Sequence, residues 1–403
     1  MKELFIPGDL LLPAENPDKW SVIACDQHTS EPEYWENCDA VVGDSPSALR
    51  MILPEVYLGK NDDERLENIA AASAEYAGKD IFRAVPNAYI YVRRQLSGRG
   101  FRRGLLGLID LEDYSYEKGS DAPIRSTEGT VLERIPPRQR VREATCLETS
   151  HVLLLADDPE DKILGPIDRK TGTMTMLYDF ELMAGGGRIT GWLVEGSAKK
   201  RINAALEEIY FRNPLSPVLA MGDGNHSAAS AKAAYEKLKE EIGPEAAAKD
   251  PRRYLMCELN NIHDDSLSFE PIHRLITGCD EVKLLKWLRD RQSSGGHPIT
   301  CTCAAGDAAV ILDKALSPLP VGAVQKLLDE YLAENQGEID YIHGEDTLRK
   351  LSAAEGCVGF ILPAPDKFGF FEALAADGAL PRKTFSMGEA CDKRYYLETR
   401  RLK

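Results

Sequence analysis

The segment of the chain that decides the fold reads PVLAMGDGNHSAASAKAAYEKLKEEI and spans residues 217–242. Pro217–Met221 is a short apolar run typical of a buried strand, and Ala228–Ile242 is Ala-rich with a helical pattern. Between them, Gly222 and Gly224 let the backbone turn tightly. The segment therefore predicts a strand that leads directly into a helix, which is the unit from which α/β folds are built.

Apolar, β-rich runs alternate with helical patterns along the rest of the chain. We expect an α/β fold with mixed sheets flanked by helices. Ser, Gly, Pro and Thr concentrate in Gln292–Gly306, and a weaker break lies near Lys118–Pro123. These breaks predict three regions: an N-terminal region (1–120), a central region that contains the Asp-Gly-Asn-His turn (121–295) and a C-terminal region (296–403). One continuous sheet could still join them.

Composition excludes some functions. The 403 residues carry a formal net charge of −16, which argues against a protein that binds nucleic acid through a broadly basic surface. No apolar run approaches the roughly 18 residues that a membrane-spanning helix needs, and no signal peptide is visible. The nine cysteines form an odd, scattered set, which favours reduced thiols. We therefore expect a cytoplasmic protein without nucleic-acid or membrane partners, and leave open whether it forms a homo-oligomer.

The strongest candidate site is the turn between Pro217–Met221 and the helix. The first turn of a helix presents N–H groups and a partial positive charge to an anion, so Gly224, Asn225 and Ser227 are candidate phosphate-binding residues. Asp223 is suited to hold a metal or accept a proton, and His226 to transfer one. The alternative is an ordinary glycine turn with a capped helix and a buried histidine.

Two further clusters are candidates for the same site. Asp26 and His28 follow the apolar run Val22–Cys25, and ligands in open α/β sheets gather at the carboxyl ends of strands. A capped turn is the competing interpretation. The positively charged or hydroxyl-bearing candidates for phosphate binding are Arg125, Thr127, Arg138, Arg140, Arg382 and Lys383. A solvated basic surface paired with nearby carboxylates, or a plain surface loop for 382 and 383, is the alternative for these residues.

A third set, His263 and Asp264, offers side-chain types that bind divalent metals, although their spacing fits no standard zinc pattern. It leaves a metal-dependent hydrolase as one alternative function.

The motifs together resemble the uncharacterised prokaryotic family called domain of unknown function 1015. The resemblance rests on Val22–Thr29, Arg125–Thr130, Gly222–Ser227, Pro271–Arg274 and Leu380–Thr384. Many members carry Asp-Gly-His-His-Arg at the turn, which is similar to the phosphate-binding turn of the ParB and sulfiredoxin superfamily. That superfamily includes a free serine kinase and nucleotide hydrolases. The resemblance therefore implies a ParB/sulfiredoxin-like core, phosphoryl transfer as the reaction, and serine or phosphoserine as the substrate.

This chain departs from that turn, because Asn225 and Ser227 replace the first histidine and the arginine. The missing guanidinium would have to come from Arg125, Arg138 or Arg382. Our hypothesis is an enzyme that transfers phosphoryl groups on a small phosphorylated metabolite, with Asp223 and His226 as the acid–base pair and magnesium and a nucleotide as cofactors. The rival is a non-catalytic sensor that binds a nucleotide or phosphometabolite in the same cleft.

Overall fold

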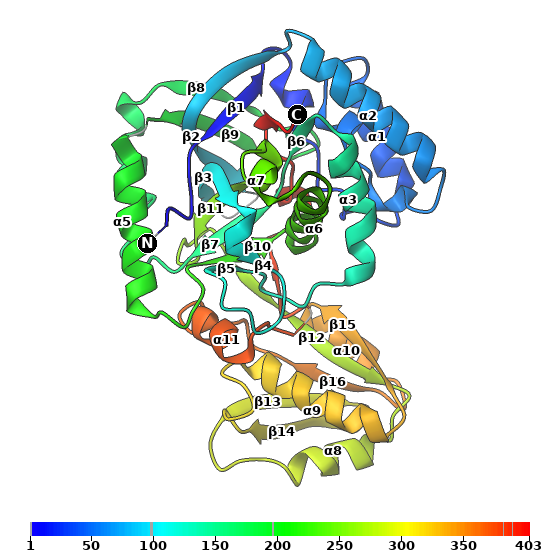
Figure 1. Cartoon of the computed structure of the whole chain (residues 1–403). Coiled ribbons are helices and arrows are strands. Elements are labelled where there is room, and N and C mark those ends of the chain that lie inside the picture. The colour runs from blue at the N-terminus through cyan, green and yellow to red at the C-terminus, as the bar shows by residue number, and fades with distance from the viewer. Residues whose placement is uncertain (1, 97–99, 196, 382, 389) are drawn as a thin grey trace. The chain divides into compact units, whose positions relative to one another are not determined.

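A computed structural model describes residues 2–96, 100–195, 197–381, 383–388 and 390–403 (Figure 1). The chain divides into two compact units. The first comprises Met1–Ser126, Thr130–Leu267 and Gly388–Lys403, and the second comprises Thr127–Gly129 and Ser268–Met387. In the described part of the chain, no helix combines the length and apolarity that crossing a bilayer requires.

One mixed sheet forms the centre of the first unit. Its strands are β1 (Gly8–Pro13), β2 (Phe82–Leu96), β3 (Gly100–Asp110), β4 (Tyr114–Ser115), β5 (Ile124–Arg125), β6 (Leu147–Thr149), β7 (Leu153–Ala156), β8 (Met176–Glu181), β9 (Arg188–Val194), β10 (Leu219–Asp223), β11 (Tyr254–Asn261) and β18 (Thr399–Arg401). Over the described residues, neighbours follow the order β4-β5-β10-β7-β11-β3-β2-β1-β18-β6, and β9 pairs with β2 and β8. β5 runs parallel to β10 and β7 parallel to β11, whereas β10 and β7 are antiparallel. The expected mixed sheet is confirmed.

Helices cover this sheet. They are α1 (Pro32–Val42), α2 (Asp62–Gly78), α3 (Ile135–Ala144), α4 (Gly165–Asp168), α5 (Ser197–Arg212), α6 (Asn225–Ile242) and α7 (Pro244–Ala247). Side chains alternate between the two faces of β2: Tyr89 and Tyr91 join a core with α5 and α6, while Ile90 and Val92 join a second core with Trp35 of α1. The sheet is thus buried on both faces, which explains the apolar runs in its central strands.

The second unit is a smaller α/β unit with its own antiparallel sheet. Its strands are β12 (Phe269–Thr277), β13 (His297–Cys303), β14 (Gly306–Leu312), β15 (Glu338–His343), β16 (Val358–Ile361) and β17 (Phe385–Met387). Its helices are α8 (Glu281–Arg289), α9 (Pro320–Glu334), α10 (Glu345–Ser352) and α11 (Phe370–Asp377). The described strands follow the order β14-β13-β16-β12-β15, with β17 beside β12.

The compact units do not follow the three consecutive regions predicted from the sequence. The Ser- and Gly-rich stretch 292–306 contains β13, which pairs with β14 and β16 inside the second unit. Strands from residues 1–120 and 121–295 alternate in one sheet, and β18 near the C-terminus returns to pair with β1 and β6. A stretch rich in Ser, Gly and Thr can therefore hold a largely buried strand such as β13, and its composition does not report which strands pair across long sequence distances.

Candidate functional site

The site lies at the end of β10, where the chain turns into α6 within the first unit (Figure 1). Gly224 adopts a left-handed conformation with φ 76° and occupies the N-cap position of α6. Glycine has no side chain to cap the helix, so the N–H groups in the first turn of α6 donate no hydrogen bond to a side chain of the N-cap residue. Asp223 accepts a hydrogen bond from the Gly224 N–H at 2.9 Å. The predicted strand, turn and helix are therefore all present.

A second segment reaches this turn through the C-terminal part of the chain. Residues 21–25 form no strand. Instead, Ile23 makes a single antiparallel bridge with Arg394, and the Ala24 N–H donates to the Lys393 carbonyl at 2.8 Å. The Lys393 ammonium lies 3.9 Å from Asp223 Oδ2. Asp26 lies two residues after Ala24, and the positive charge of Lys393 contributes to lowering the pKa of its carboxyl. Lys393 therefore interacts electrostatically with both predicted carboxylates.

Asp26 is held in its ionised form. Burial opposes ionisation of its carboxyl, but the attraction of His151 and of other groups outweighs burial, so the pKa of Asp26 is lowered. The other groups are the Gln27 amide, Arg138 and Lys393. At neutral pH this carboxylate can accept a proton or contribute an oxygen ligand to a metal.

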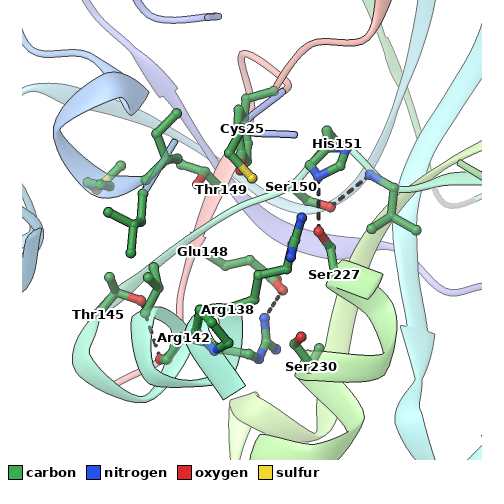
Figure 2. A pocket seen from close by; sticks show the side chains of 18 of the residues that line it. Cys25, Arg138, Arg142, Thr145, Glu148, Thr149, Ser150, His151, Ser227 and Ser230 are labelled. Atoms are coloured by element: carbon green, nitrogen blue, oxygen red, sulfur yellow. Dashed lines mark hydrogen bonds and ion pairs between the residues drawn. The ribbon is translucent and has the colours of Figure 1, made fainter. Parts of the chain in front are cut away.

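A pocket opens beside the first turn of α6, and all of its lining belongs to the first unit (Figure 2). It encloses about 90 Å³. Its polar wall includes Cys25, Arg138, His151 and Ser227, and its apolar wall includes the side chains of Met51, Ile52, Leu53, Val141 and Leu255. Burial raises the pKa of the Cys25 thiol to about 11, so it is a neutral thiol at physiological pH.

His151 is the functional candidate that sequence reasoning missed. It is buried, with 4% of its surface exposed, and its Nε2 lies 3.0 Å from Ser227 Oγ. Its ring packs edge-to-face against Tyr395, with ring centroids 5.0 Å apart. In the sequence, His151 is a single histidine before the apolar run of β7. Such a residue has no partner at a recognisable spacing, so only the tertiary structure reveals its neighbours.

The predicted arginine cluster disperses in the structure. Arg138 reaches the pocket and pairs with Glu55. Burial works against its charge, but the acidic groups of Cys25, Glu55 and Asp26 outweigh burial, and the pKa of Arg138 is raised. Arg140 instead pairs with Asp63 at an exposed position.

Arg125 is buried on β5, and its side chain does not extend toward the turn. Its guanidinium donates to the backbone carbonyls of Ala122 at 2.7 Å and Leu215 at 3.3 Å. Leu215 precedes β10, whereas Asp223 ends it. The Arg125 side chain is therefore directed to the opposite end of the strand, and it supports the backbone there.

The other residues of the predicted turn have described partners. Asn225 Oδ1 accepts a hydrogen bond from the Ser126 hydroxyl at 2.6 Å, and His226 Nε2 accepts one from the Val131 N–H at 3.3 Å. These contacts tie the first turn of α6 to residues 126–131. They also direct His226 Nε2 to a backbone donor, so the predicted pairing of His226 with Asp223 remains a prediction.

His28 is engaged close to its own position in the chain. Its ring stacks on Tyr34, with centroids 3.8 Å apart, and its Nδ1 lies 3.0 Å from Glu31 Oε1. His28 is not among the residues that line the pocket. The arrangement supports a local structural role at the start of α1.

Two further predicted phosphate-binding residues, Thr127 and Lys383, do not line this pocket. Thr127 and Lys383 belong to the second unit. Thr127 is fully buried, and the Lys383 carbonyl accepts a hydrogen bond from Arg274. Arg382 lies outside the described residues. Their predicted roles in phosphate binding stay predictions.

The alternative metal site is occupied by protein contacts. His263 Nε2 lies 2.6 Å from Asp157, and Asp264 accepts a hydrogen bond from Arg103 at 2.7 Å. Among residues that the structure describes, no three His, Cys, Asp or Glu side chains group closely enough to hold a metal. Magnesium commonly uses one or two carboxylates together with phosphate oxygens, and Asp26 and Asp223 each carry a carboxylate of that kind.

Comparison with known proteins places these features in context. Residues 9–333, more than half of the chain, match the model of the family described as "Protein of unknown function (DUF1015)". No curated protein matches the chain.

Several solved structures are similar. One is a free serine kinase in complex with AMP, at 13% identity and a TM-score of 0.36, covering 71% of this chain and 89% of that chain. A second is SbnI with C-terminal truncation from Staphylococcus aureus, at 11% identity and a TM-score of 0.36, covering 70% and 82%. A third is a conserved hypothetical protein from Pyrococcus furiosus, at 13% identity and a TM-score of 0.33, covering 70% and 89%. At these values the likenesses carry no inference about the site.

Proposed function

We propose that this chain, which belongs to the DUF1015 family of proteins of unknown function, transfers a phosphoryl group on a small metabolite at the first turn of α6. One observation carries the proposal. Asp26 and Asp223 come from distant segments, and Lys393 attracts both of them beside the N-terminus of a helix. Phosphoryl transfer depends mainly on positioning and on charge stabilisation, and this arrangement supplies both.

Anion binding is assigned to the positive groups of the site. The first turn of α6 directs its amides and its partial positive charge toward a bound phosphate. Arg138 in the pocket wall and Lys393 beside Asp223 add two full charges. Together they would offset the negative charge that accumulates on the transferred group.

Proton transfer is assigned first to Asp26. Its carboxylate is ionised at neutral pH, so it can accept a hydrogen bond from an attacking hydroxyl, orient that hydroxyl and take its proton as the new bond to phosphorus forms. Asp223 is the second candidate, and with Asp26 it would hold magnesium against the phosphate oxygens. Bound magnesium would draw charge from those oxygens.

For the substrate we propose serine or phosphoserine, with a nucleotide as the phosphoryl donor or acceptor. The support is the family resemblance described above, in which many members carry a turn similar to the phosphate-binding turn of a superfamily that includes a free serine kinase, although Asn225 and Ser227 depart from it in this chain. A hydroxyl that attacks or leaves, as in serine, suits a site with an ionised carboxylate beside an anion-binding helix terminus.

The test combines binding with turnover. Thermal melting is measured with serine, phosphoserine, ATP, ADP and pyrophosphate, each with and without magnesium, and product is followed by phosphorus NMR in the same samples. We expect stabilisation by a phosphorylated ligand and formation of product. Asp26→Asn and Asp223→Asn should abolish turnover without lowering the melting temperature.

Asp265→Asn is the matched control, because Asp265 is exposed and distant in sequence from both carboxylates. Ligand-dependent stabilisation without product in any combination would favour the sensor over the enzyme. Full turnover in both the Asp26 and Asp223 variants would contradict the proposal.

A further inference from the structure

We propose that Ser227 is a nucleophile that takes up the phosphoryl group covalently, with His151 as its general base. This inference rests on the proposed phosphoryl transfer and adds an intermediate to it. The reaction would then proceed in two steps through a phosphoserine on α6. Ser227 belongs to the turn identified from the sequence, but His151 belongs to no sequence motif, so their pairing is inferred from the pocket geometry.

The first observation is the contact between the two side chains. His151 Nε2 lies 3.0 Å from Ser227 Oγ, within hydrogen-bond distance for a hydroxyl and its base (Figure 2). Both side chains line the same pocket, so a ligand there has access to the hydroxyl. A serine is a poor nucleophile unless a base removes its proton, and an imidazole nitrogen at this distance meets that requirement.

The second observation is that the His151 ring is held in place. It is buried and packs edge-to-face on Tyr395. The ring also lies beside the residue that opens α6, because a Cβ at Gly224 would lie 3.5 Å from His151 Cε1, an ordinary van der Waals distance. The His151 ring therefore packs directly beside the first turn of the helix.

The third observation concerns the other nitrogen of the ring. Among the described residues, His151 Nδ1 is buried and has no hydrogen-bond partner. Buried polar atoms are normally satisfied, so an unpartnered one indicates a missing water or ligand atom. When Nε2 accepts the serine proton, Nδ1 carries the ring's own proton and can donate it to an oxygen of a bound anion.

The surroundings suit a developing negative charge. Ser227 lies in the first turn of α6, where helix amides and the helix dipole favour anions. Arg138 lies in the same pocket wall. The carboxylate of Asp26 is attracted to His151, and it would stabilise the imidazolium that forms.

The chemical step balances with a phosphoanhydride as donor. The Ser227 oxygen forms a bond to phosphorus, and the bridging oxygen–phosphorus bond of the donor breaks. The leaving phosphate or nucleotide takes the bonding electron pair, and the serine proton moves to His151 Nε2. In the second step the oxygen of an acceptor hydroxyl or of water forms a bond to phosphorus, and the proton of that hydroxyl passes to the Asp26 carboxylate, which releases it to solvent. The bond between phosphorus and the Ser227 oxygen breaks, and the proton on Nε2 returns to the Ser227 oxygen as it leaves.

Ser230 provides a matched comparison one helical turn later. It also borders the pocket, but its hydroxyl donates to the backbone carbonyls of His226 at 2.7 Å and Ile135 at 3.2 Å. Among its described partners there is no imidazole nitrogen that could remove the proton of its hydroxyl. The two serines thus share a helix and a pocket and differ in whether a base is present.

The test uses the full chain with ATP or acetyl phosphate as donor. Samples are quenched in acid, which hydrolyses phosphohistidine, and are then treated with hydroxylamine, which cleaves aspartyl phosphate, whereas phosphoserine survives both treatments. The peptide that contains residue 227 is analysed by mass spectrometry. We expect one phosphoryl group on Ser227 in the wild-type protein and in Ser230→Ala. We expect none in Ser227→Ala, and His151→Gln should slow labelling by about 10²–10⁴-fold.

Turnover is measured in parallel, so that failure of the covalent intermediate can be distinguished from failure of the proposed phosphoryl transfer. Wild-type turnover without labelled Ser227, or full turnover in Ser227→Ala, overturns the covalent intermediate and leaves the proposed function standing. Absence of both turnover and ligand-induced stabilisation overturns the proposed function and the intermediate together. Should Ser227→Ala fold poorly, site mapping in the wild-type protein and in Ser227→Thr, which keeps the hydroxyl, decides the question.

Discussion

The Lys393 ammonium lies 3.9 Å from Asp223 Oδ2, although the two residues belong to different parts of the chain. The backbone of Lys393 pairs with Ala24, and its side chain reaches the turn before α6. Lys393 therefore joins the segment that carries Asp26 to the segment that carries Asp223. A cation that contacts Asp223 beside a helix N-terminus, and that also lowers the pKa of the Asp26 carboxyl, is the feature on which the proposed site depends.

Replacing Lys393 by Met should weaken binding of a phosphorylated ligand by about 10- to 100-fold, the size expected for one charge-assisted hydrogen bond. Isothermal titration calorimetry with phosphoserine and with ATP measures the change. Lys162→Met is the control, because Lys162 pairs with Glu160 and Glu208 at an exposed position. Equal affinity in the wild-type and Lys393 variants would remove this cation from the site.

Arg138 and Arg140 give a second, paired prediction. Arg138→Gln should lower ligand affinity at least about tenfold, because the pocket loses a charge that faces the anion. Arg140→Gln should leave affinity unchanged and alter stability by less than about 1 kcal/mol, since its partner Asp63 is exposed. The same titrations and a urea denaturation curve test both variants. A loss of affinity in Arg140→Gln would contradict the assignment of that residue to the surface.

Gly224 should be sensitive for two reasons. Alanine there would be strained at φ 76°, and its Cβ would meet Val152 at 3.0 Å. Gly243 at the other end of α6 has φ 84°, but a Cβ at that position would meet no atom within 4 Å. We expect Gly224→Ala and Gly243→Ala each to cost about 1–3 kcal/mol, while only Gly224→Ala abolishes ligand binding. Denaturation and titration of both variants separate helix stability from the site.

Glu398 predicts a pH dependence of stability. It is fully buried, and burial raises its pKa from 4.5 to about 7, although Tyr178 donates a hydrogen bond to it. Between pH 4.5 and 7 the unfolded chain loses this proton and the folded chain keeps it. The free energy of unfolding therefore falls as pH rises, and the stability that the protein has below pH 4.5 is reduced until pH passes 7.

Glu398→Gln should remove that loss and stabilise the protein at pH 8 by up to about 3 kcal/mol. Urea denaturation at pH 5 and pH 8 measures the free energy of unfolding in both proteins. Glu345→Gln, which changes an exposed partner of Arg349, should leave the pH dependence as it is in the wild-type chain. If the free energy of unfolding of Glu398→Gln changed with pH by the same amount as that of the wild-type protein, Glu398 would not be the source of the pH dependence.

Local sequence patterns were sufficient for much of the fold. Pro217–Met221 and Ala228–Ile242 predicted β10 and α6 because the buried spacing within a strand or helix repeats over a few residues. The glycine at position 224 likewise predicted a turn, because few other residues adopt its backbone angles. Patterns at short range therefore revealed both the α/β class and the turn between β10 and α6.

The tertiary structure decided which distant side chains meet at that turn. Sequence proximity grouped Arg138 with Arg140 and Asp26 with His28, yet helix and turn geometry separates each pair. His151 joins Ser227, and Lys393 joins Asp223, through strand pairings that no local pattern reports. Residues close in sequence point to different sides of a helix or strand, whereas residues far apart become neighbours when sheets assemble, so only the folded chain specifies the site.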